Sequence, residues 1–236
     1  AGQGGRGGAV SGAAPRAGHD DDGAFDVHPP ARPYPGLRPF DEDEWPIFFG
    51  RERMVDEVVA RLIGQHLVVV HGDSGSGKSS LIRAGVLPRL RQEHARGGVR
   101  WRTVTALPRG GPLQRLAQAL ATLDGRGQDT ERVLALRRAL NLGRRAPPAI
   151  AELMLRDDHD HLGLLIDQFE ELFEHARTLP GGAAEARTLT DALVALAEAP
   201  PRGLYVALTM RSEFLGACAR FPGFAEGLPG EGEVAG

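Results

Sequence analysis

The sequence predicts an α/β fold in which helices cover both faces of a parallel sheet. Short β-branched apolar runs alternate with longer amphipathic stretches, and a glycine-rich turn joins the first apolar run to a helix. Because strands alternate with helices, we expect βαβ crossovers, three layers and a ligand site at the carboxyl ends of the strands. The 236 residues, 42% of them hydrophobic, suffice for one sizeable core.

The expected elements follow from the length and periodicity of the apolar runs. The run HLVVVH is too short for a helix and too uniformly apolar for a surface strand, so it suits a buried parallel strand. Runs of similar character complete the expected strands at residues 66–71, 99–107, 162–167 and 203–210. Helical periodicity predicts helices over residues 49–64, 78–91, 112–123, 130–142, 169–178 and 184–199.

The ends of the chain differ in composition from the middle. Residues 1–33 combine Gly, Ala, Pro and an acidic patch with almost no bulky apolar side chain, so a disordered linker is expected there. The predicted domain spans residues 34–226, and residues 227–236 are expected to form a flexible tail. The chain lacks an initiating Met and ends soon after the fourth expected strand, so we interpret it as part of a longer protein.

Charge and composition argue against several classes of partner. The formal net charge is -3, and Lys and Arg are scattered among Asp and Glu, so no nucleic-acid partner is expected. No apolar run approaches the roughly 20 residues that a membrane-spanning helix needs. The single cysteine, Cys218, cannot form an internal disulfide. This fits a reducing compartment, and we expect the protein to be cytoplasmic.

The turn after the first strand has the spacing of a phosphate-binding loop, or P-loop: Gly72, four residues, Gly77, Lys78 and Ser79. Glycines permit backbone angles that turn N–H groups toward an anion. The lysine ammonium can reach the β- and γ-phosphates, and the serine hydroxyl can ligate Mg²⁺. The alternative is a loop that happens to contain glycines, but its place between a strand and a helix favours nucleotide binding. The expected nucleotide-binding residues of the loop are Gly72, Asp73, Ser74, Gly75, Ser76, Gly77, Lys78, Ser79 and Ser80.

A carboxylate is expected at the end of a neighbouring strand, because hydrolysis needs one to hold the water shell of the metal. Asp167 follows the apolar run LGLLI and is predicted, with Ser79, to hold Mg²⁺. Glu170 and Glu171 come next, and either could polarise an attacking water. The alternative is that these acids merely favour the N-terminus of the following helix.

Arg211, at the end of the fourth expected strand, is a candidate sensor of the γ-phosphate, since a guanidinium binds phosphate oxygens through two N–H groups. An ordinary surface arginine is the alternative. The chain lacks the Asn-Lys-x-Asp motif that reads guanine, so ATP is expected rather than GTP. It also lacks the Leu-Ser-Gly-Gly-Gln signature of transporter-type ATPases.

Five segments occur in an order and spacing that resemble one family. They are PYPGLRPF, FFGRER, GDSGSGKSSLIRAGVLPRL, LLIDQFEELF and LTMRSEFLGACARFP. Together they resemble the novel STAND domain, a branch of the signal-transduction ATPases with numerous domains, over about residues 33–225. The resemblance implies a P-loop fold with strand order 5-1-4-3-2. It also implies that Phe49 and Gly50 lie near the adenine, that Glu170 activates water and that Arg211 is the first sensor.

The same resemblance implies a regulatory role. In such proteins ATP binding favours an oligomer that activates an attached effector, and hydrolysis or ADP holds the resting state. Fused effector and sensor domains, such as WD-type repeats, would then lie outside these residues. The chain departs from the pattern because the fifth strand, the helical lid and the winged-helix region are missing after GLPGEGEVAG. An exposed sheet edge beside the P-loop strand is therefore expected.

Two rival functions remain open at the level of sequence. A P-loop kinase or transferase would need a pocket for a second substrate and a lid rich in basic residues. A binding module would hold ATP for structural reasons without significant hydrolysis. The pair of acids Asp167 and Glu170 favours hydrolysis over this last reading.

Overall fold

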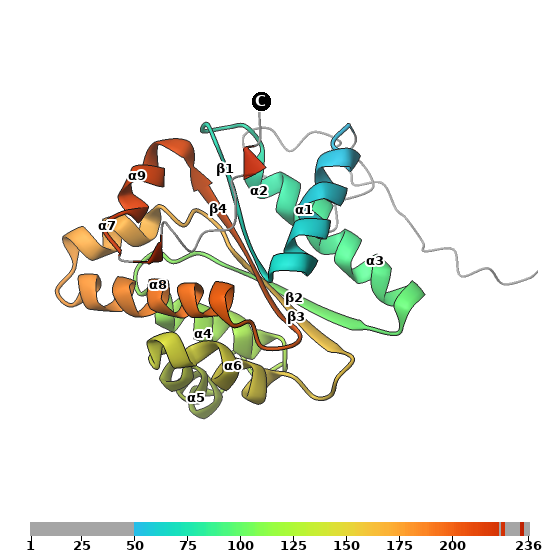
Figure 1. The fold of residues 1–236 in the computed structure, drawn as a ribbon. Helices are drawn as coiled ribbons and strands as arrows, with labels where there is room; N and C mark the ends of the chain where they lie inside the picture. Colours follow the sequence, from blue (N-terminus) through green and yellow to red (C-terminus); the bar gives the residue numbers. More distant parts are fainter. Residues whose placement is uncertain (1–49, 222, 225–231, 234–236) are drawn as a thin grey trace, which may run out of the picture.

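A computed structural model describes residues 50–221, 223–224 and 232–233. Helices lie on both faces of a twisted sheet, which gives the three layers that the sequence predicts (Figure 1). The predicted linker, residue Phe49 and most of the predicted tail lie outside the described residues. None of the described helices is long and apolar enough to span a membrane.

The sheet is parallel throughout, and its strand order confirms the expected 5-1-4-3-2 arrangement. From one edge to the other, the strands are β2 (Arg100–Ala106), β3 (Asp160–Ile166), β4 (Leu204–Arg211), β1 (Leu67–Gly72) and β5 (Gly232–Glu233). The four long strands begin and end within two residues of the predicted bounds.

The expectation that the fifth strand is absent is wrong, and the expected exposed edge of β1 is covered at two of its six residues. A two-residue strand, β5, pairs with β1 through Val70 and Gly232 and through His71 and Glu233. An unpaired edge of β1 would expose backbone donors and acceptors that an extended segment can satisfy. Strand β5 does so at Val70 and His71. Among the described residues, the outer strands of the sheet are therefore β2 and β5.

The first layer of helices packs on one face of the sheet and contains α1 and the helical segment that leaves the P-loop. Its elements are α1 (Glu52–Gln65), α2 (Lys78–Ser80), a π-helical stretch (Leu81–Val86) and α3 (Leu87–Gly97). Val68 and Val70 of β1 point into this layer, where they meet Leu62, Ile82 and Leu90. The sequence predicts one helix after Lys78 but not its π-helical interruption.

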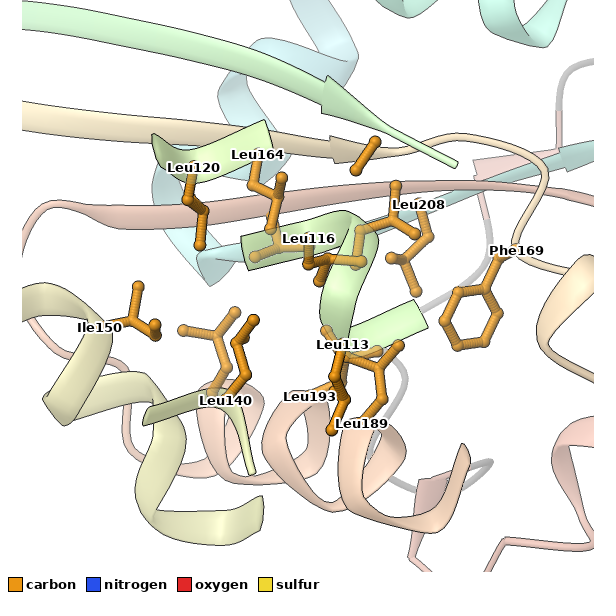
Figure 2. Close-up of a cluster of buried hydrophobic side chains, with 14 of the residues drawn as sticks. Leu113, Leu116, Leu120, Leu140, Ile150, Leu164, Phe169, Leu189, Leu193 and Leu208 are labelled. Atoms are coloured by element: carbon orange, nitrogen blue, oxygen red, sulfur yellow. The ribbon is translucent and has the colours of Figure 1, made fainter. Parts of the chain in front are cut away.

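The second layer packs on the opposite face and holds the larger core. Its helices are α4 (Pro112–Thr122), α5 (Thr130–Leu140), α6 (Ala146–Met154), α7 (Glu171–Thr178), α8 (Gly182–Glu198) and α9 (Leu215–Cys218). Leu164 and Leu208 project from the sheet into this layer, between Leu116 of α4, Leu193 of α8 and Phe169 (Figure 2). Because side chains alternate along a strand, β3 sends Leu164 to this core and Leu165 to the first layer.

Helix α6 is the one long element of the described chain that the sequence patterns do not predict. It begins with Ala146, Pro147 and Pro148. Proline is tolerated in the first turn of a helix because the N–H it lacks has no intrahelical partner there. Here the two prolines start a helix rather than prevent one.

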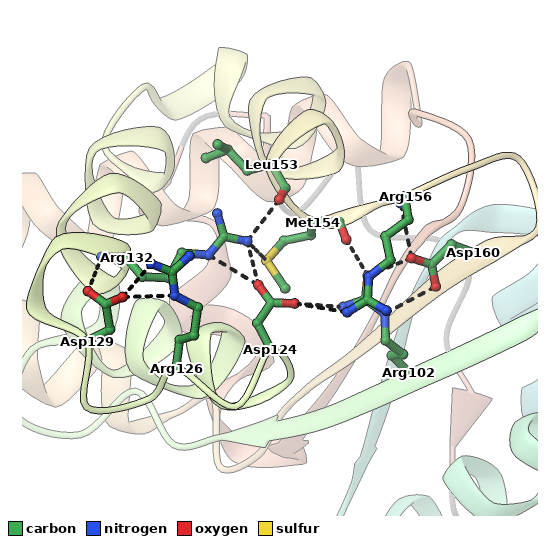
Figure 3. A network of polar contacts seen from close by, with 9 residues as sticks. All are labelled: Arg102, Asp124, Arg126, Asp129, Arg132, Leu153, Met154, Arg156 and Asp160. Carbon is green, nitrogen blue, oxygen red and sulfur yellow. Dashed lines mark hydrogen bonds and ion pairs between the residues drawn. The ribbon is translucent and has the colours of Figure 1, made fainter.

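Buried ion pairs tie the amino ends of β2 and β3 to the second layer. Arg102 of β2 donates two hydrogen bonds to the carboxylate of Asp160, at 3.1 and 2.7 Å, and one to Asp124, at 3.2 Å. Arg132 of α5 donates to the other oxygen of Asp124, at 2.6 Å, and to the carbonyl of Leu153, at 2.9 Å (Figure 3). This network lies at the end of the sheet opposite the P-loop.

Candidate nucleotide site

The P-loop connects the end of β1 to the start of α2. Its glycines differ from one another in backbone conformation, which the sequence does not predict. Gly75 and Gly77 have positive φ angles of 82° and 86°, which a side chain would disfavour. Gly72 instead keeps extended backbone as the last residue of β1, in register with Arg211 of β4. The expectation that all three glycines supply unusual backbone angles is therefore wrong for Gly72.

The remaining predicted loop residues have different surroundings. Asp73, Ser74 and Gly75 form the exposed crest of the turn, Ser76 and Gly77 are half-buried, and Ser80 is buried in α2. The carbonyl of Asp73 accepts hydrogen bonds from Lys78 Nζ and from the N–H of Ser76. Ser80 faces the protein interior.

Lys78 is buried, and its ammonium folds back over the loop. Nζ donates to the carbonyl of Gly72 at 2.9 Å and to that of Asp73 at 2.6 Å. Burial lowers the pKa of Lys78, while the Glu170 carboxylate opposes that shift. The loop therefore holds a desolvated cation at the place where phosphate oxygens are expected.

Arg51, which directly precedes α1, contacts the P-loop. This contact is not predicted from the sequence. Its Nη1 donates to the carbonyl of Ser76 at 2.8 Å. A Cβ at position 77 would lie 3.2 Å from the same nitrogen, so the guanidinium lies close against the bare Cα of Gly77. Gly50, predicted to lie near the adenine, is exposed with φ 87° and precedes Arg51. The one feature of the sequence that could have indicated this contact is the position of Arg51 in the segment FFGRER.

Asp167 lies directly after β3, and its carboxylate is fully buried. Its Oδ1 accepts hydrogen bonds from Ser79 Oγ at 2.7 Å, from Thr209 Oγ1 at 2.5 Å and from the backbone N–H of Gln168 at 3.1 Å. The structure thus brings together Ser79 and Asp167, the two residues predicted to hold Mg²⁺. Thr209 was not predicted, because only the pairing of β3 with β4 places it beside Asp167.

Arg83 completes the surroundings of Asp167. Its Nη2 donates to Asp167 Oδ2 at 2.7 Å, and the guanidinium side chain is 20% exposed. Arg83 is not among the residues predicted from the sequence. Its spacing of four residues from Ser79 is a helical signal that could have found it.

Glu170 and Glu171 face different partners. Glu170 precedes the first turn of α7; its Oε1 lies 3.3 Å from Arg211 Nε, and its buried Oε2 has no hydrogen-bond partner among the described residues. Burial raises the pKa of Glu170, against the opposing charges of Arg211 and Lys78. Glu171 lies 3.9 Å from Arg109, which follows β2. Glu170 is thus the acid that shares the electrostatic environment of Lys78.

Arg211 ends β4 and is half-exposed. Besides Glu170, it pairs with Glu213, whose Oε1 lies 3.6 Å from Nη1. A guanidinium held by two carboxylates at the open side of the site can exchange one of them for a phosphate oxygen.

The donor set around Ser79 and Asp167 fits Mg²⁺. A hydroxyl and a carboxylate are the oxygen ligands that this ion prefers, and it usually keeps several waters and takes further oxygens from phosphates. In the part of the chain that the structure describes, no group of three or more His, Cys, Asp or Glu side chains could hold a metal alone. The residues therefore suit an ion that arrives with a nucleotide.

Comparisons with known proteins agree with the fold. The family model described as Novel STAND NTPase 1 matches residues 33–235. Two similar solved structures come from Aeropyrum pernix. ORC2 in ADPNP-ADP complexes has 13% identity and a TM-score of 0.52, covering 79% of this chain and 48% of that one. ORC1 in complex with DNA has 17% identity and a TM-score of 0.50, covering 82% and 47%.

These structural likenesses concern the fold alone, because the identities are low. This chain spans about half the length of the two ORC chains. A search of curated proteins finds no match.

Proposed function

The chain belongs to the novel STAND NTPase 1 family and is a nucleotide-binding NTPase domain of the STAND type, and from this premise we propose that it is an ATP-hydrolysing regulatory switch. Slow, Mg²⁺-dependent hydrolysis would control self-association and an attached effector. The observation that carries the proposal is the convergence of Lys78, the Ser79–Asp167 pair and Glu170 at the carboxyl ends of β1 and β3.

Binding would depend on the P-loop backbone and Lys78. The positive φ angles of Gly75 and Gly77 shape the turn, and the close partners of the buried Lys78 ammonium among the described residues are carbonyl and hydroxyl oxygens. Phosphate oxygens would be stronger acceptors for that charge. Arg51 would keep Ser76 and Gly77 in place, and we propose that Phe49 and Gly50 contact the adenine.

Ser79 and Asp167 would hold Mg²⁺. When bound, the ion neutralises charge that develops on the phosphate oxygens. Asp167 is already oriented for this role by Thr209 and by the N–H of Gln168.

Glu170 would orient and deprotonate the attacking water. A general base works best when its pKa is close to the working pH, and burial moves the pKa of Glu170 upward. Its buried Oε2 has no partner among the described residues, so this oxygen can accept a hydrogen bond from water. Arg211, bound to the other oxygen, would exchange Glu170 for the γ-phosphate and so report the triphosphate.

The partners of the switch form the finer part of the proposal. Self-association on ATP binding, and fused effector or sensor domains such as WD-type repeats, follow from the family alone. One structural neighbour was solved with DNA, but the scattered basic residues of this chain give no reason to propose a nucleic-acid partner. We place the switch in the cytoplasm, where its single buried thiol suits a reducing environment.

The test is to measure ATP binding, ATP turnover and oligomer size for the full chain and three variants. We expect Lys78→Ala to abolish binding. We expect Glu170→Gln to keep binding, slow turnover by about 100-fold or more and favour the assembled state, because only the base is lost. Glu171→Gln is the matched control and should behave like the wild type.

Two results would change the assignment. If Glu170→Gln turned ATP over at the wild-type rate while Glu171→Gln did not, the base would be Glu171. If the wild type bound ATP without turnover, the chain would be a nucleotide-binding scaffold. Transfer of phosphate to a second substrate would instead support a kinase.

A further inference from the structure

Ser79 and Arg83 lie on one face of the helical segment that leaves the P-loop. They are four residues apart, and the segment becomes π-helical from Leu81 to Val86. Such wide turns are rare and occur frequently at functional sites. Both side chains reach Asp167: Ser79 binds Oδ1 and Arg83 binds Oδ2, each at 2.7 Å.

The Asp167 carboxylate is fully buried, so its charge needs compensation from within the protein. Three of its four donors contribute no net charge: two hydroxyls and one backbone N–H. Arg83 supplies the full positive charge at hydrogen-bonding distance. The guanidinium therefore stands where it stabilises the same negative charge that would attract a divalent cation.

We propose that Arg83 competes with Mg²⁺ for the charge of Asp167 and thereby sets the metal affinity of the site. A divalent ion held by Ser79 and Asp167 would lie on the other side of a single carboxylate from the guanidinium. Two cations that share one carboxylate repel each other because their charges have the same sign, and salt screens this repulsion little at a buried site. Arg83 is thus a positioning residue that weakens metal binding and holds the Asp167 carboxylate in place without the metal.

This inference rests on the proposed function, since it takes Ser79 and Asp167 as the residues that hold the metal. It adds that the π-helical segment responds to the metal. When Mg²⁺ neutralises Asp167, the attraction between Asp167 and Arg83 weakens. The helix that carries Arg83 would then be less firmly held to β3.

The experiment measures how Mg²⁺ changes ATP affinity in the full chain, without relying on turnover. ATP binding is followed by calorimetry, first in EDTA and then at increasing free Mg²⁺. The variants are Arg83→Gln, which removes the charge, and Arg83→Lys, which keeps a charge on a shorter side chain. Arg89→Gln is the control, because Arg89 lies further along the same segment, paired with Asp56 at 3.2 Å.

We expect the half-saturating Mg²⁺ concentration to fall about tenfold in Arg83→Gln and about threefold in Arg83→Lys, as the cation is removed or drawn back from the carboxylate. Arg89→Gln should match the wild type. Thermal unfolding in EDTA should show a lower midpoint for Arg83→Gln, because the buried carboxylate loses its countercharge. Mg²⁺ with ATP should raise that midpoint by more than it raises the wild-type midpoint.

An unchanged or higher half-saturating concentration in either Arg83 variant would overturn the proposal, since Arg83 would then be a structural partner only. Arg83→Lys keeps this outcome accessible if Arg83→Gln does not fold. Failure of the wild type to bind ATP would instead contradict the proposed function. ATP binding that ignores Mg²⁺ in the wild type would remove Ser79 and Asp167 as the metal pair.

Discussion

Two buried aspartates stand at opposite ends of β3, and they differ in what surrounds them. Asp160, at the amino end, is 2% exposed, and Asp167, just past the carboxyl end, is 0% exposed. Arg102 donates two hydrogen bonds to the carboxylate of Asp160, and the backbone N–H of Arg156 donates a third at 3.1 Å. Every one of these donors is a nitrogen that can only donate.

Asp167 also binds an arginine, but two of its donors are hydroxyl groups. A hydroxyl can donate to a carboxylate or accept from another donor, and it can ligate a metal. Ser79 can therefore exchange its bond to Asp167 for a different partner. The comparison teaches that burial and an ion pair do not separate a structural carboxylate from the one that we propose to bind Mg²⁺. The exchangeability of the donors does.

The sharpest test of this contrast is Asp160→Ala. We expect it to lower the free energy of unfolding by about 3–5 kcal/mol, because Arg102 and Arg132 would then share the single carboxylate of Asp124 in a largely buried place. Urea unfolding gives the value. ATP affinity of the folded variant should be unchanged. Asp158→Ala is the control, because its side chain is 78% exposed and its loss should cost little.

Asp167→Asn should have the opposite profile. The amide keeps an oxygen for Ser79 and Thr209 but removes the charge that pairs with Arg83, so we expect a loss of about 1–3 kcal/mol in unfolding free energy. ATP should still bind in EDTA, but Mg²⁺ should no longer tighten it. Calorimetry with and without Mg²⁺ measures this. If Asp167→Asn lost as much stability as Asp160→Ala and its ATP affinity still increased with Mg²⁺, the proposed difference between Asp160 and Asp167 would be contradicted.

A smaller effect is expected from the backbone of the P-loop, where a substitution in the proposed site can be compared with a similar one outside it. Gly77→Ala and Gly98→Ala both place a side chain at positive φ, 86° and 71°, which costs about 1–2 kcal/mol. At position 98 the new Cβ meets nothing within 4 Å, whereas at 77 it approaches Arg51. We expect similar strain from both and weaker ATP binding from Gly77→Ala alone. Equal ATP affinities in the two variants would mean that the contact between Arg51 and Gly77 does not contribute to nucleotide binding.

The smallest expected effect concerns the pH dependence of stability. Burial raises the pKa of Glu170 above its ordinary value of 4.5, so the folded protein binds this proton more tightly than the unfolded chain. As the pH rises from 4.5 through the folded pKa, stability is lost. Glu170→Gln has no such loss. Its thermal midpoint should therefore be higher than that of the wild type above this pH range and equal to it below. Thermal midpoints between about pH 4 and pH 8 show the difference. A constant offset across that range would contradict the assignment.

The sequence predicts those parts of the site that depend on neighbouring residues. The P-loop is contiguous, and Asp167 and Arg211 follow directly from the ends of apolar runs. Strands β1, β3 and β4 are equally easy to predict, because nearly all of their residues are buried on both faces, whereas the outer strand β2 is mostly half-buried. The order of strands came from the family resemblance, and the structure confirms it.

What the sequence does not reveal depends on register or on contacts between distant segments. Arg83 contacts Asp167 from within a π-helical stretch that the sequence pattern does not predict, and Thr209 contacts it because β4 pairs with β3. Arg51 required the approach of the segment before α1 to the P-loop. Strand β5 has too few residues to show a pattern.

The position of β1 between β4 and β5 has a consequence for the order in which the protein is made. Both neighbours of the P-loop strand are translated late: about 130 residues separate Gly72 from Leu204, and β5 comes later still. At about 5–20 residues per second, a ribosome needs roughly 7–26 s to supply the first of them. During that time LVVVH has no native strand to pair with. Chaperone dependence during synthesis would thus concentrate on the segment that later cradles the nucleotide.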